Sequence, residues 1–533
     1  MAGLPFASPE AQPTLKWPPA APSPLLDRLR VHAAAGDGVA LGDAGDGQAA
    51  VVYRELWERV QAIATALRAG RPSLAGEPVA FLIPPGRAYV EVLLGVLAAG
   101  GMAVPLSPLH TAPEVAYIVG NAAPVQLVTA PELFARAAAA AATQSVVTPD
   151  ELAARARSAS AGPIAAAQVS AGAPAIMLYT SGTTGRPKGV VLSHGAVAAT
   201  LASLEIAWRW RRDDRLLHVL PLHHTHGLIV ALLGALWAGA TATFLAFDAA
   251  RVWDRLGEST LFMAVPTMYA KLVDAYRAAA PEQRAAWSAG ARRLRLLTSG
   301  SAALPAPLLR AFEEATGQTI LERYGMTEIG MALSNRFDGP RVAGAVGVPL
   351  PGVEIDIVGD DEQSARDGEP GELRVRSPQL FSGYHGDAAA TASSYDGAGR
   401  FRTGDTGVRE PDGVIRLLGR TSVDVLKSGG YKISALEIEA ALRDHPAIAD
   451  LAVIGVPDPT LTWGDLVTAC VVLRDGASLT LDQLKEFARD RLAVYKLPRA
   501  LRVCAALPRN AMGKVQKKQL MDAEPATDEG SRP

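Results

Sequence analysis

The chain has 533 residues, of which 49% are hydrophobic and 20% are charged, and its formal net charge is −2. This length exceeds what one hydrophobic core organises, so we expect two or more domains, and the near-zero charge gives no electrostatic basis for binding nucleic acid or an anionic membrane. The two cysteines, Cys470 and Cys504, are too few for a disulfide framework and lack metal-ligand spacing.

The N-terminal stretch 1–23 is rich in proline and alanine, contains Glu10, and has Lys16 as its only basic residue. This composition is typical of neither a secretory signal nor an arginine-rich transit peptide. We therefore expect a disordered lead and a cytoplasmic protein.

Residues 25–347 alternate apolar runs with Ala/Leu-rich stretches, which predicts α/β layers. Leu93–Leu106 and Leu232–Leu245 share one pattern, a buried helix that stops at glycine and leads into a buried strand. The repetition indicates two related sheets. Gly227–Phe247 has 21 residues without a charge, long enough to cross a bilayer, but the glycine stop and the strand favour a buried helix.

From about residue 348 the sequence pattern changes to short β runs, which predict a small β-barrel. From Thr421 onward the pattern predicts a compact α+β module. The sequence thus predicts an α/β protein with two layered subdomains and a small barrel in a large N-terminal domain, followed by a small α+β domain. The expected boundaries are a disordered lead 1–23, a large domain 24–419, a small domain 420–522 and a disordered tail 523–533.

The segment Tyr179–Gly189 carries three glycines, four Ser/Thr hydroxyls, Arg186 and Lys188 in eleven residues, directly after an apolar run. Glycines at a strand end let phosphate oxygens approach the backbone N–H groups, and the cations add charge. The segment lacks the Gly-Lys-Ser/Thr of the NTPase P-loop. It predicts a different kind of phosphate-binding loop.

Five further motifs are suited to nucleotide chemistry. Pro221–Gly227 has three histidines without carboxylate or cysteine, which favours a pocket-lining role over a metal site. Leu296–Ala303 ends in small residues against which a flat ring can lie. Glu322–Glu328 joins an aromatic ring, a hydroxyl and a carboxylate for stacking a base and holding a divalent cation. Thr403–Asp405 offers a carboxylate to ribose hydroxyls, and Pro508–Lys514 places a lysine after a turn glycine.

In this order, Tyr179–Gly189, Tyr324–Glu328, Thr403–Asp405 and Asn510–Lys514 resemble the adenylate-forming superfamily of acyl-CoA synthetases, carrier adenylation domains and luciferases. The similarity runs from about residue 25 to 520. Members activate a carboxylate with Mg-ATP to an acyl-adenylate, release pyrophosphate and pass the acyl group to a thiol. The resemblance therefore implies ATP, Mg²⁺ and CoA as cofactor and co-substrates, and a mobile C-terminal domain.

The resemblance also implies roles for individual residues. Those implied for ATP are Thr180, Ser181, Gly182, Thr183, Thr184, Gly185, Lys188, Ser301, Ala302, Ala303, Tyr324, Gly325, Thr327, Asp405, Arg420 and Lys514. Those implied for catalysis are Lys514, Thr327, Glu328 and His224, with Glu328 and Thr184 as Mg²⁺ ligands. Those implied for CoA are Lys427, Ser428, Gly429 and Gly430. The hinge is expected in 420–424, where Ser422 stands in place of the Asp or Lys of many relatives.

Three stretches, 223–227, 263–269 and 294–304 leading into 321–328, resemble the malonyl-CoA synthetases of this superfamily. A dicarboxylate needs a cation for the carboxylate that does not react, and arginine pairs with it bidentately. The resemblance places Arg295 in that role, although a solvated charge at a strand edge is the alternative. The other acyl-site residues it implies are His226, Ser299 and Met326. The expected reaction is ATP-dependent conversion of malonate, or methylmalonate, to its CoA thioester by an AMP-forming acid–thiol ligase.

Two other classes of protein remain open. One is an acyl-CoA synthetase for a short, medium or aromatic monocarboxylate, or an adenylation enzyme that loads a carrier protein; no phosphopantetheine-attachment segment follows within the chain. The other is a luciferase-like or non-catalytic relative, disfavoured by Lys514, Glu328 and Asp405. The expected partners are the carboxylate, ATP and CoA, with neither nucleic acid nor a membrane span.

Overall fold

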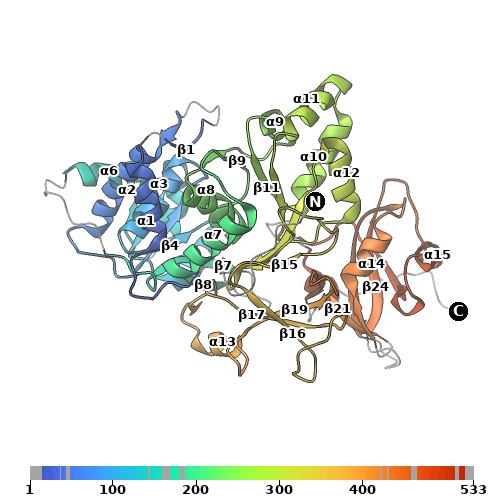
Figure 1. The fold of residues 1–533 in the computed structure, drawn as a ribbon. Coiled ribbons are helices and arrows are strands. Elements are labelled where there is room, and N and C mark those ends of the chain that lie inside the picture. The colour runs from blue at the N-terminus through green and yellow to red at the C-terminus, as the bar shows by residue number, and fades with distance from the viewer. Residues whose placement is uncertain are drawn as a thin grey trace, which may run out of the picture.

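The computed structural model describes residues 15–36, 38–43, 49–141, 144–158, 168–180, 187–420, 423–428, 431–457, 465–509 and 515–522. The large N-terminal part holds two sheets that share one core, and a small C-terminal module follows (Figure 1). The predicted α/β fold class is confirmed.

The first sheet has seven strands in the order β18-β8-β7-β4-β3-β5-β6. Strands β3 to β7 pair in parallel, while β8 and β18 add to the edge antiparallel. Their bounds are β3 (Pro78–Leu82), β4 (Met102–Pro105), β5 (Gln126–Thr129), β6 (Val146–Val147), β7 (Pro174–Thr180), β8 (Lys188–Ser193) and β18 (Gly383–Tyr384).

The second sheet has nine strands in the order β15-β14-β13-β12-β11-β9-β10-β1-β2. Its centre, from β13 to β1, is parallel. The bounds are β1 (Val39–Leu41), β2 (Val51–Val52), β9 (Arg215–His218), β10 (Thr241–Phe244), β11 (Leu261–Ala264), β12 (Leu296–Ser299), β13 (Leu321–Met326), β14 (Gly330–Ser334) and β15 (Val348–Pro349).

Helices cover both sheets. The first group comprises α1 (Pro24–Ala34), α2 (Tyr53–Arg68), α3 (Arg87–Ala98), α4 (Ala112–Ala122), α5 (Phe134–Ala140), α6 (Pro149–Ser158), α7 (His194–Trp208) and α8 (Gly234–Ala238). The second group comprises α9 (Ala249–Leu256), α10 (Pro266–Ala278), α11 (Pro281–Ala291) and α12 (Ala306–Thr316), which pack on the outer face of the nine-stranded sheet around Trp253 and Phe312.

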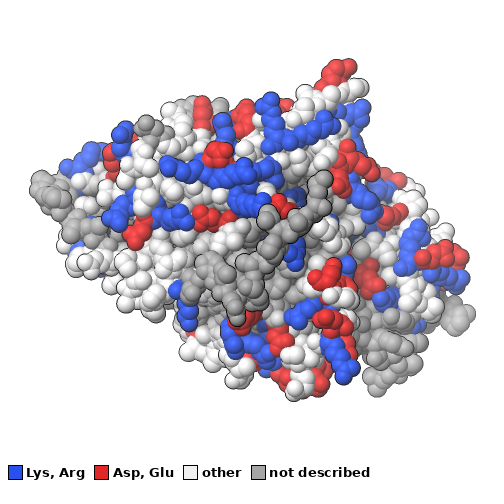
Figure 2. All heavy atoms as spheres, viewed as in Figure 1, with Lys and Arg blue, Asp and Glu red and all other residues white. Residues whose placement is uncertain are grey.

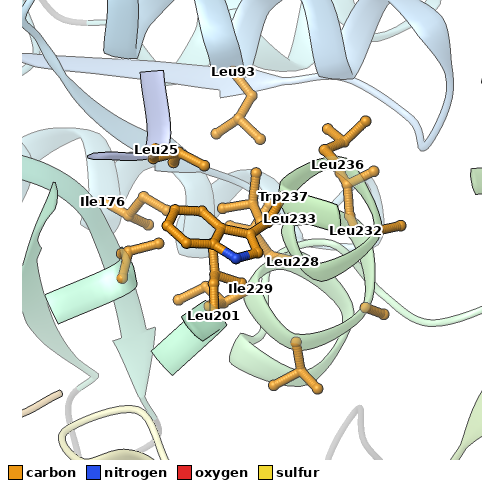
Figure 3. Packing of buried hydrophobic residues seen from close by; sticks show 14 of the residues in the cluster. Leu25, Leu93, Ile176, Leu201, Leu228, Ile229, Leu232, Leu233, Leu236 and Trp237 are labelled. Carbon is orange, nitrogen blue, oxygen red and sulfur yellow. The ribbon is translucent and has the colours of Figure 1, made fainter. Parts of the chain in front are cut away.

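The long uncharged segment forms the centre of the core. A π-helix over His226–Leu233 leads into α8. Helix α8 ends at Gly239, just before β10. Figure 3 shows Trp237 among leucines of this segment, with Leu25, Ile176 and Leu201 from other elements around it. The prediction of a buried helix, glycine stop and strand is confirmed. No helix in the described ranges is long and apolar enough to span a membrane.

Downstream of the two sheets, the predicted small β-barrel is a four-stranded antiparallel sheet in the order β16-β17-β19-β20. Its strands are β16 (Glu354–Val358), β17 (Gly371–Arg376), β19 (Phe401–Arg409) and β20 (Ile415–Arg420), with α13 (Ala388–Ser393) beside them. Short runs of alternating burial build an antiparallel sheet because one of its faces can stay in water.

The C-terminal module pairs a hairpin of β21 and β22 with a three-stranded sheet in the order β23-β24-β25. Its elements are β21 (Val425–Ser428), β22 (Tyr431–Ser434), α14 (Ala435–Leu442), β23 (Ile448–Pro457), β24 (Asp465–Leu473), α15 (Leu481–Arg489), β25 (Ala500–Val503) and α16 (Lys517–Asp522). Its own apolar cluster forms between α14, α15 and this sheet. Figure 2 shows acidic and basic side chains interspersed on the face in view, in keeping with the small net charge.

The disordered lead predicted for 1–23 is wrong for residues 15–23. Leu15 is buried in the main core, and Trp17 packs edge-on against Trp237. Ser23 caps α1 and its hydroxyl bonds the ring of buried His194. Two large apolar anchors therefore outweigh the proline-rich composition.

A buried ion cluster ties α16 to the start of the small module. The ammonium of Lys517 lies 2.6 Å from the carboxylate of Asp424 and 2.7 Å from that of Glu439. Asp424 also accepts the backbone N–H of Arg420 at 3.0 Å, the last residue of β20. These two carboxylates raise the pKa of Lys517 against the opposing effect of its burial. The cluster thus joins three segments that are distant in sequence.

We expect Lys517→Met to lower the free energy of unfolding of the small module by about 3–5 kcal/mol, because it leaves two buried carboxylates without their cation. Urea unfolding followed by circular dichroism measures this loss. The matched control is Lys485→Met, whose partner Asp482 is almost fully exposed at 3.8 Å; its effect should stay below about 1 kcal/mol. Equal effects of the two changes would contradict the assigned importance of the cluster.

Candidate active site

The candidate site lies at the carboxyl ends of the parallel strands. The loops that leave these ends carry the predicted motifs: 219–226 after β9, 300–303 after β12, and 327–328 after β13. Ligands of open α/β sheets bind at this edge because the loops and free N–H groups converge there. The strand order therefore brings together motifs about a hundred residues apart.

The ribose side of the site is a chain of hydrogen bonds. The hydroxyl of Tyr324 donates to Oδ2 of Asp405, and Oδ1 of Asp405 lies 3.0 Å from Nε of Arg420. Burial raises the pKa of Tyr324, so the phenol keeps its proton and donates. In the loop after β12, Ser301 has a φ of 69° and is exposed, as are Ala302 and Ala303. This open backbone is suited to a flat base.

The carboxylate of Glu328 is suited to be a ligand of Mg²⁺. It is buried, burial raises the pKa of its carboxyl, and Oε1 accepts the hydroxyl of Tyr384 at 3.0 Å. Among the described residues no group of three or more His, Cys, Asp or Glu is placed to enclose a metal ion. One carboxylate fits Mg²⁺, because this ion is commonly held by one or two carboxylates together with substrate phosphates and waters.

Two rings of the histidine loop lie against each other and against His110, which comes from the turn after β4. The ring centroids of His223 and His224 are 4.0 Å apart, and that of His110 lies 5.5 Å from His223. Burial lowers the pKa of His224 to about 4, so this ring is neutral at pH 7. Thr225 in the same loop donates to the hydroxyl of Thr327 at 3.1 Å. The loop therefore contacts the residue predicted to meet the α-phosphate.

Arg323 is a buried cation that the sequence analysis missed. It is 4% exposed, and its Nε and Nη2 have no hydrogen-bond partner in the described chain. Burial lowers the pKa of Arg323 only to about 10, so it stays charged. A Cβ at Gly300 would lie 2.3 Å from its Cζ, which places the guanidinium against the end of β12.

Several polar atoms near Arg323 also have no hydrogen-bond partner among the described residues. The alternation of side chains places Thr298 on β12 and His218 on β9 on its face of the sheet, with the inward apolar residues of the main core. Burial, together with the positive charge of Arg323, holds the pKa of His226 well below its usual value. Neither ring nitrogen of His226, nor the Thr298 hydroxyl, has a partner among the described residues. Buried polar atoms without partners mark a site that a polar ligand completes.

The expectation that Arg295 serves the acyl pocket is wrong. Arg295 directly precedes β12, at the amino end, and four strand residues separate the two edges by about 13 Å. Its Nε donates to Asp214 at 2.7 Å, Nη2 pairs with the other oxygen of Asp214, and Nη1 donates to the carbonyl of Trp208 at 3.0 Å. Asp214 is 2% exposed. Arg295 is therefore the partner of a buried structural carboxylate.

The other predicted residues have four different outcomes. His226 and Met326 lie at the carboxyl edge with Arg323, whereas alternation turns Ser299 with Leu297 to the opposite face, so its acyl role is not supported. Ser428 is buried in this conformation. Outside the described residues lie Ser181, Gly182, Thr183, Thr184, Gly185, Ser422, Gly429, Gly430 and Lys514.

Comparison with known proteins identifies the relatives of this chain. The AMP-binding enzyme family matches residues 30–385, and the AMP-binding enzyme C-terminal domain matches residues 437–514. The mitochondrial malonate–CoA ligase of Mus musculus is 41% identical over 504 residues, covering 88% of this chain and 86% of that protein.

Solved structures agree with these matches. ATP-bound MatB from Rhodopseudomonas palustris has a TM-score of 0.84 at 34% identity and covers 94% of this chain and 98% of its own. A malonyl-CoA ligase product complex with methylmalonyl-CoA and AMP has a TM-score of 0.63 at 37% identity, covering 93% of this chain and 100% of its own.

Since Arg295 neutralises buried Asp214, we expect Arg295→Leu to lower the free energy of unfolding by about 3 kcal/mol, the lower part of the range for a broken buried pair. Asp214 keeps its hydrogen bonds from Thr260 and from the backbone of Arg211. Urea unfolding measures the loss. The ratio of activities toward a dicarboxylate and a monocarboxylate should not change. A changed ratio would show that Arg295 does contact the acyl substrate.

Proposed function

The chain belongs to the AMP-binding enzyme family, and on that premise we propose that it is an ATP-dependent malonate–CoA ligase. The observation that carries this proposal is Arg323, a buried guanidinium without a counter-ion in the described chain, next to neutral His226. A dicarboxylate supplies the missing charge, whereas a monocarboxylate leaves it unpaired. The names of the relatives agree with this chemistry.

The first half-reaction joins the carboxylate to the nucleotide. One carboxylate oxygen of malonate attacks the α-phosphorus of ATP, the bond to the β-phosphate oxygen breaks, and pyrophosphate leaves. Arg323 holds the distal carboxylate, Asp405 and Arg420 bind the ribose, and Thr327 contacts the α-phosphate. Glu328 would hold Mg²⁺, which would neutralise part of the phosphate charge. Charge placed in advance in this way commonly contributes about 10²–10³ in rate per group.

In the second half-reaction the sulfur of CoA attacks the acyl carbonyl and AMP leaves. The family resemblance assigns this step to a rotated small domain, with the hinge in 420–424. The structure of the chain has a higher TM-score against the ATP-bound relative than against the product complex, although the sequence identities to the two are similar. This difference in TM-score supports the view that the small domain has the position used in the adenylation half-reaction. The proposal includes a large domain over residues 24–419 and a small domain over residues 420–522.

The alternatives make different demands on the site. A synthetase for medium-chain or aromatic monocarboxylates requires an apolar acyl pocket, and Arg323 opposes it. A carrier protein as thiol acceptor is distinguished from CoA by offering each of them to the malonyl-adenylate that the enzyme forms. A cytoplasmic location is also part of the proposal; the Mus musculus relative, by contrast, is named as mitochondrial.

If Lys514 acts only during adenylation, Lys514→Ala should abolish malonate-dependent pyrophosphate release. Transfer of the malonyl group from supplied malonyl-adenylate to CoA should stay within a few-fold of wild type. Parallel assays of the two half-reactions measure this. An equal loss in both steps would show that the lysine is structural.

Arg323→Met should lower kcat/KM for malonate by about 2–5 kcal/mol in transition-state terms, because the distal carboxylate loses its buried partner. Propionate, which has a methyl group in place of that carboxylate, should be spared or improved. Steady-state kinetics with both acids measure the change.

Arg295→Leu is the matched control, since it removes an arginine 28 positions earlier whose charge is already paired. It should leave the malonate-to-propionate ratio unchanged. A malonate preference that survives Arg323→Met would contradict the proposed function.

A further inference from the structure

The short strand β18 connects two parts of the candidate site. It pairs antiparallel with β8, the strand that begins at Lys188. On one side, the backbone N–H of His385 donates to Gly189 at 2.7 Å; on the other, the N–H of Phe381 donates to the carbonyl of Glu328 at 2.8 Å. One five-residue segment thus joins the strand after the phosphate loop to the backbone of the magnesium carboxylate.

The side chain of Tyr384 makes the same connection again. Its hydroxyl donates to Oε1 of Glu328 at 3.0 Å, and the ammonium of Lys188 lies 5.0 Å from the centroid of its ring. Lys188 is held from a second side by Asp387, 3.5 Å away. Tyr384 therefore contacts a carboxylate through its hydroxyl and an ammonium through its ring face.

The orientation of the Tyr384 ring is fixed by its neighbours. Its backbone N–H donates to the hydroxyl of Thr391 at 2.9 Å, and its ring meets Phe381 edge-on at 4.9 Å. Phe381 in turn packs against Phe401 and Tyr395. A ring held in this way cannot turn away from Glu328 without disturbing an aromatic cluster.

We propose that Tyr384 is a positioning residue that sets Glu328 for Mg²⁺ and Lys188 for the ATP phosphates through one side chain. The inference rests on the ATP site of the proposed function and assigns a role to a residue outside its motifs. The phenol O–H stabilises and orients the ionised carboxylate, as groups behind metal ligands do. The ring face attracts the ammonium and restricts the positions that it can take.

Two substitutions separate these contributions. Tyr384→Phe removes only the hydroxyl, so affinity for Mn²⁺ in the complex with α,β-methylene-ATP should fall about 10-fold, the lower end for loss of a group behind a metal ligand. Affinity for the metal-free nucleotide should not change. Tyr384→Leu also removes the ring, and we expect it to weaken metal-free nucleotide binding as well, by about 3-fold. Electron paramagnetic resonance of Mn²⁺ and calorimetry measure the two affinities.

Tyr395→Phe is the matched control, because Tyr395 packs on the same Phe381 and, among the described residues, its recorded ring contacts are with Phe381 and Phe401. It should leave both affinities unchanged. Transfer from supplied malonyl-adenylate to CoA should be unaffected in all three variants, since that step follows the release of pyrophosphate.

The proposal is overturned if Tyr384→Phe binds Mn²⁺ as tightly as the wild type, or if Tyr395→Phe loses the same affinity, which would make the effect one of packing. Urea unfolding of each variant shows whether the fold is retained. Failure of the wild type to bind α,β-methylene-ATP would refute the ATP site itself, so the two failures are distinguishable.

Discussion

The direction of the parallel strands in the nine-stranded sheet determines which side chains can meet the substrate. β9, β11, β12 and β13 all point the same way, so their carboxyl ends form one edge and their amino ends the other. Residues that follow or end these strands reach the site. Residues that precede them, such as Arg295, lie about one strand length away and serve the packing of the opposite edge.

Electrostatics then distinguishes the two buried arginines. Arg295 is paired with Asp214 and bonded to a backbone carbonyl, so its charge is satisfied within the fold. Arg323 remains charged, and neither it nor its neighbour His226 is satisfied by the residues that the structure describes. Retaining such a cation costs stability, and that cost is offset when an anionic group binds. An acid with a second carboxylate is the ligand that meets this requirement.

Much of this arrangement follows from local sequence patterns. Glycine stops after apolar helices predicted the two sheets, and the motifs at Tyr324–Glu328 and Asp405 predicted side chains that the fold does bring together. The acyl cation could not be chosen in this way, because Arg292, Arg293 and Arg295 precede one strand and Arg323 lies in another, and residue type alone does not distinguish them. Strand alternation counted from buried Leu321 does mark Arg323 as inward-facing, so the sequence carries this signal. Tyr384 carries no motif, and only the pairing of β18 with β8 reveals its position.

The central claim is that the acyl pocket requires a second carboxylate. ATP–pyrophosphate exchange by the wild-type protein, measured across malonate, methylmalonate, acetate, propionate, butyrate and an aromatic acid, tests it most directly. Pairing with a buried arginine predicts that malonate exceeds each monocarboxylate by at least about 30-fold in kcat/KM, equivalent to about 2 kcal/mol. A medium-chain or aromatic monocarboxylate that matches or exceeds malonate would contradict the claim.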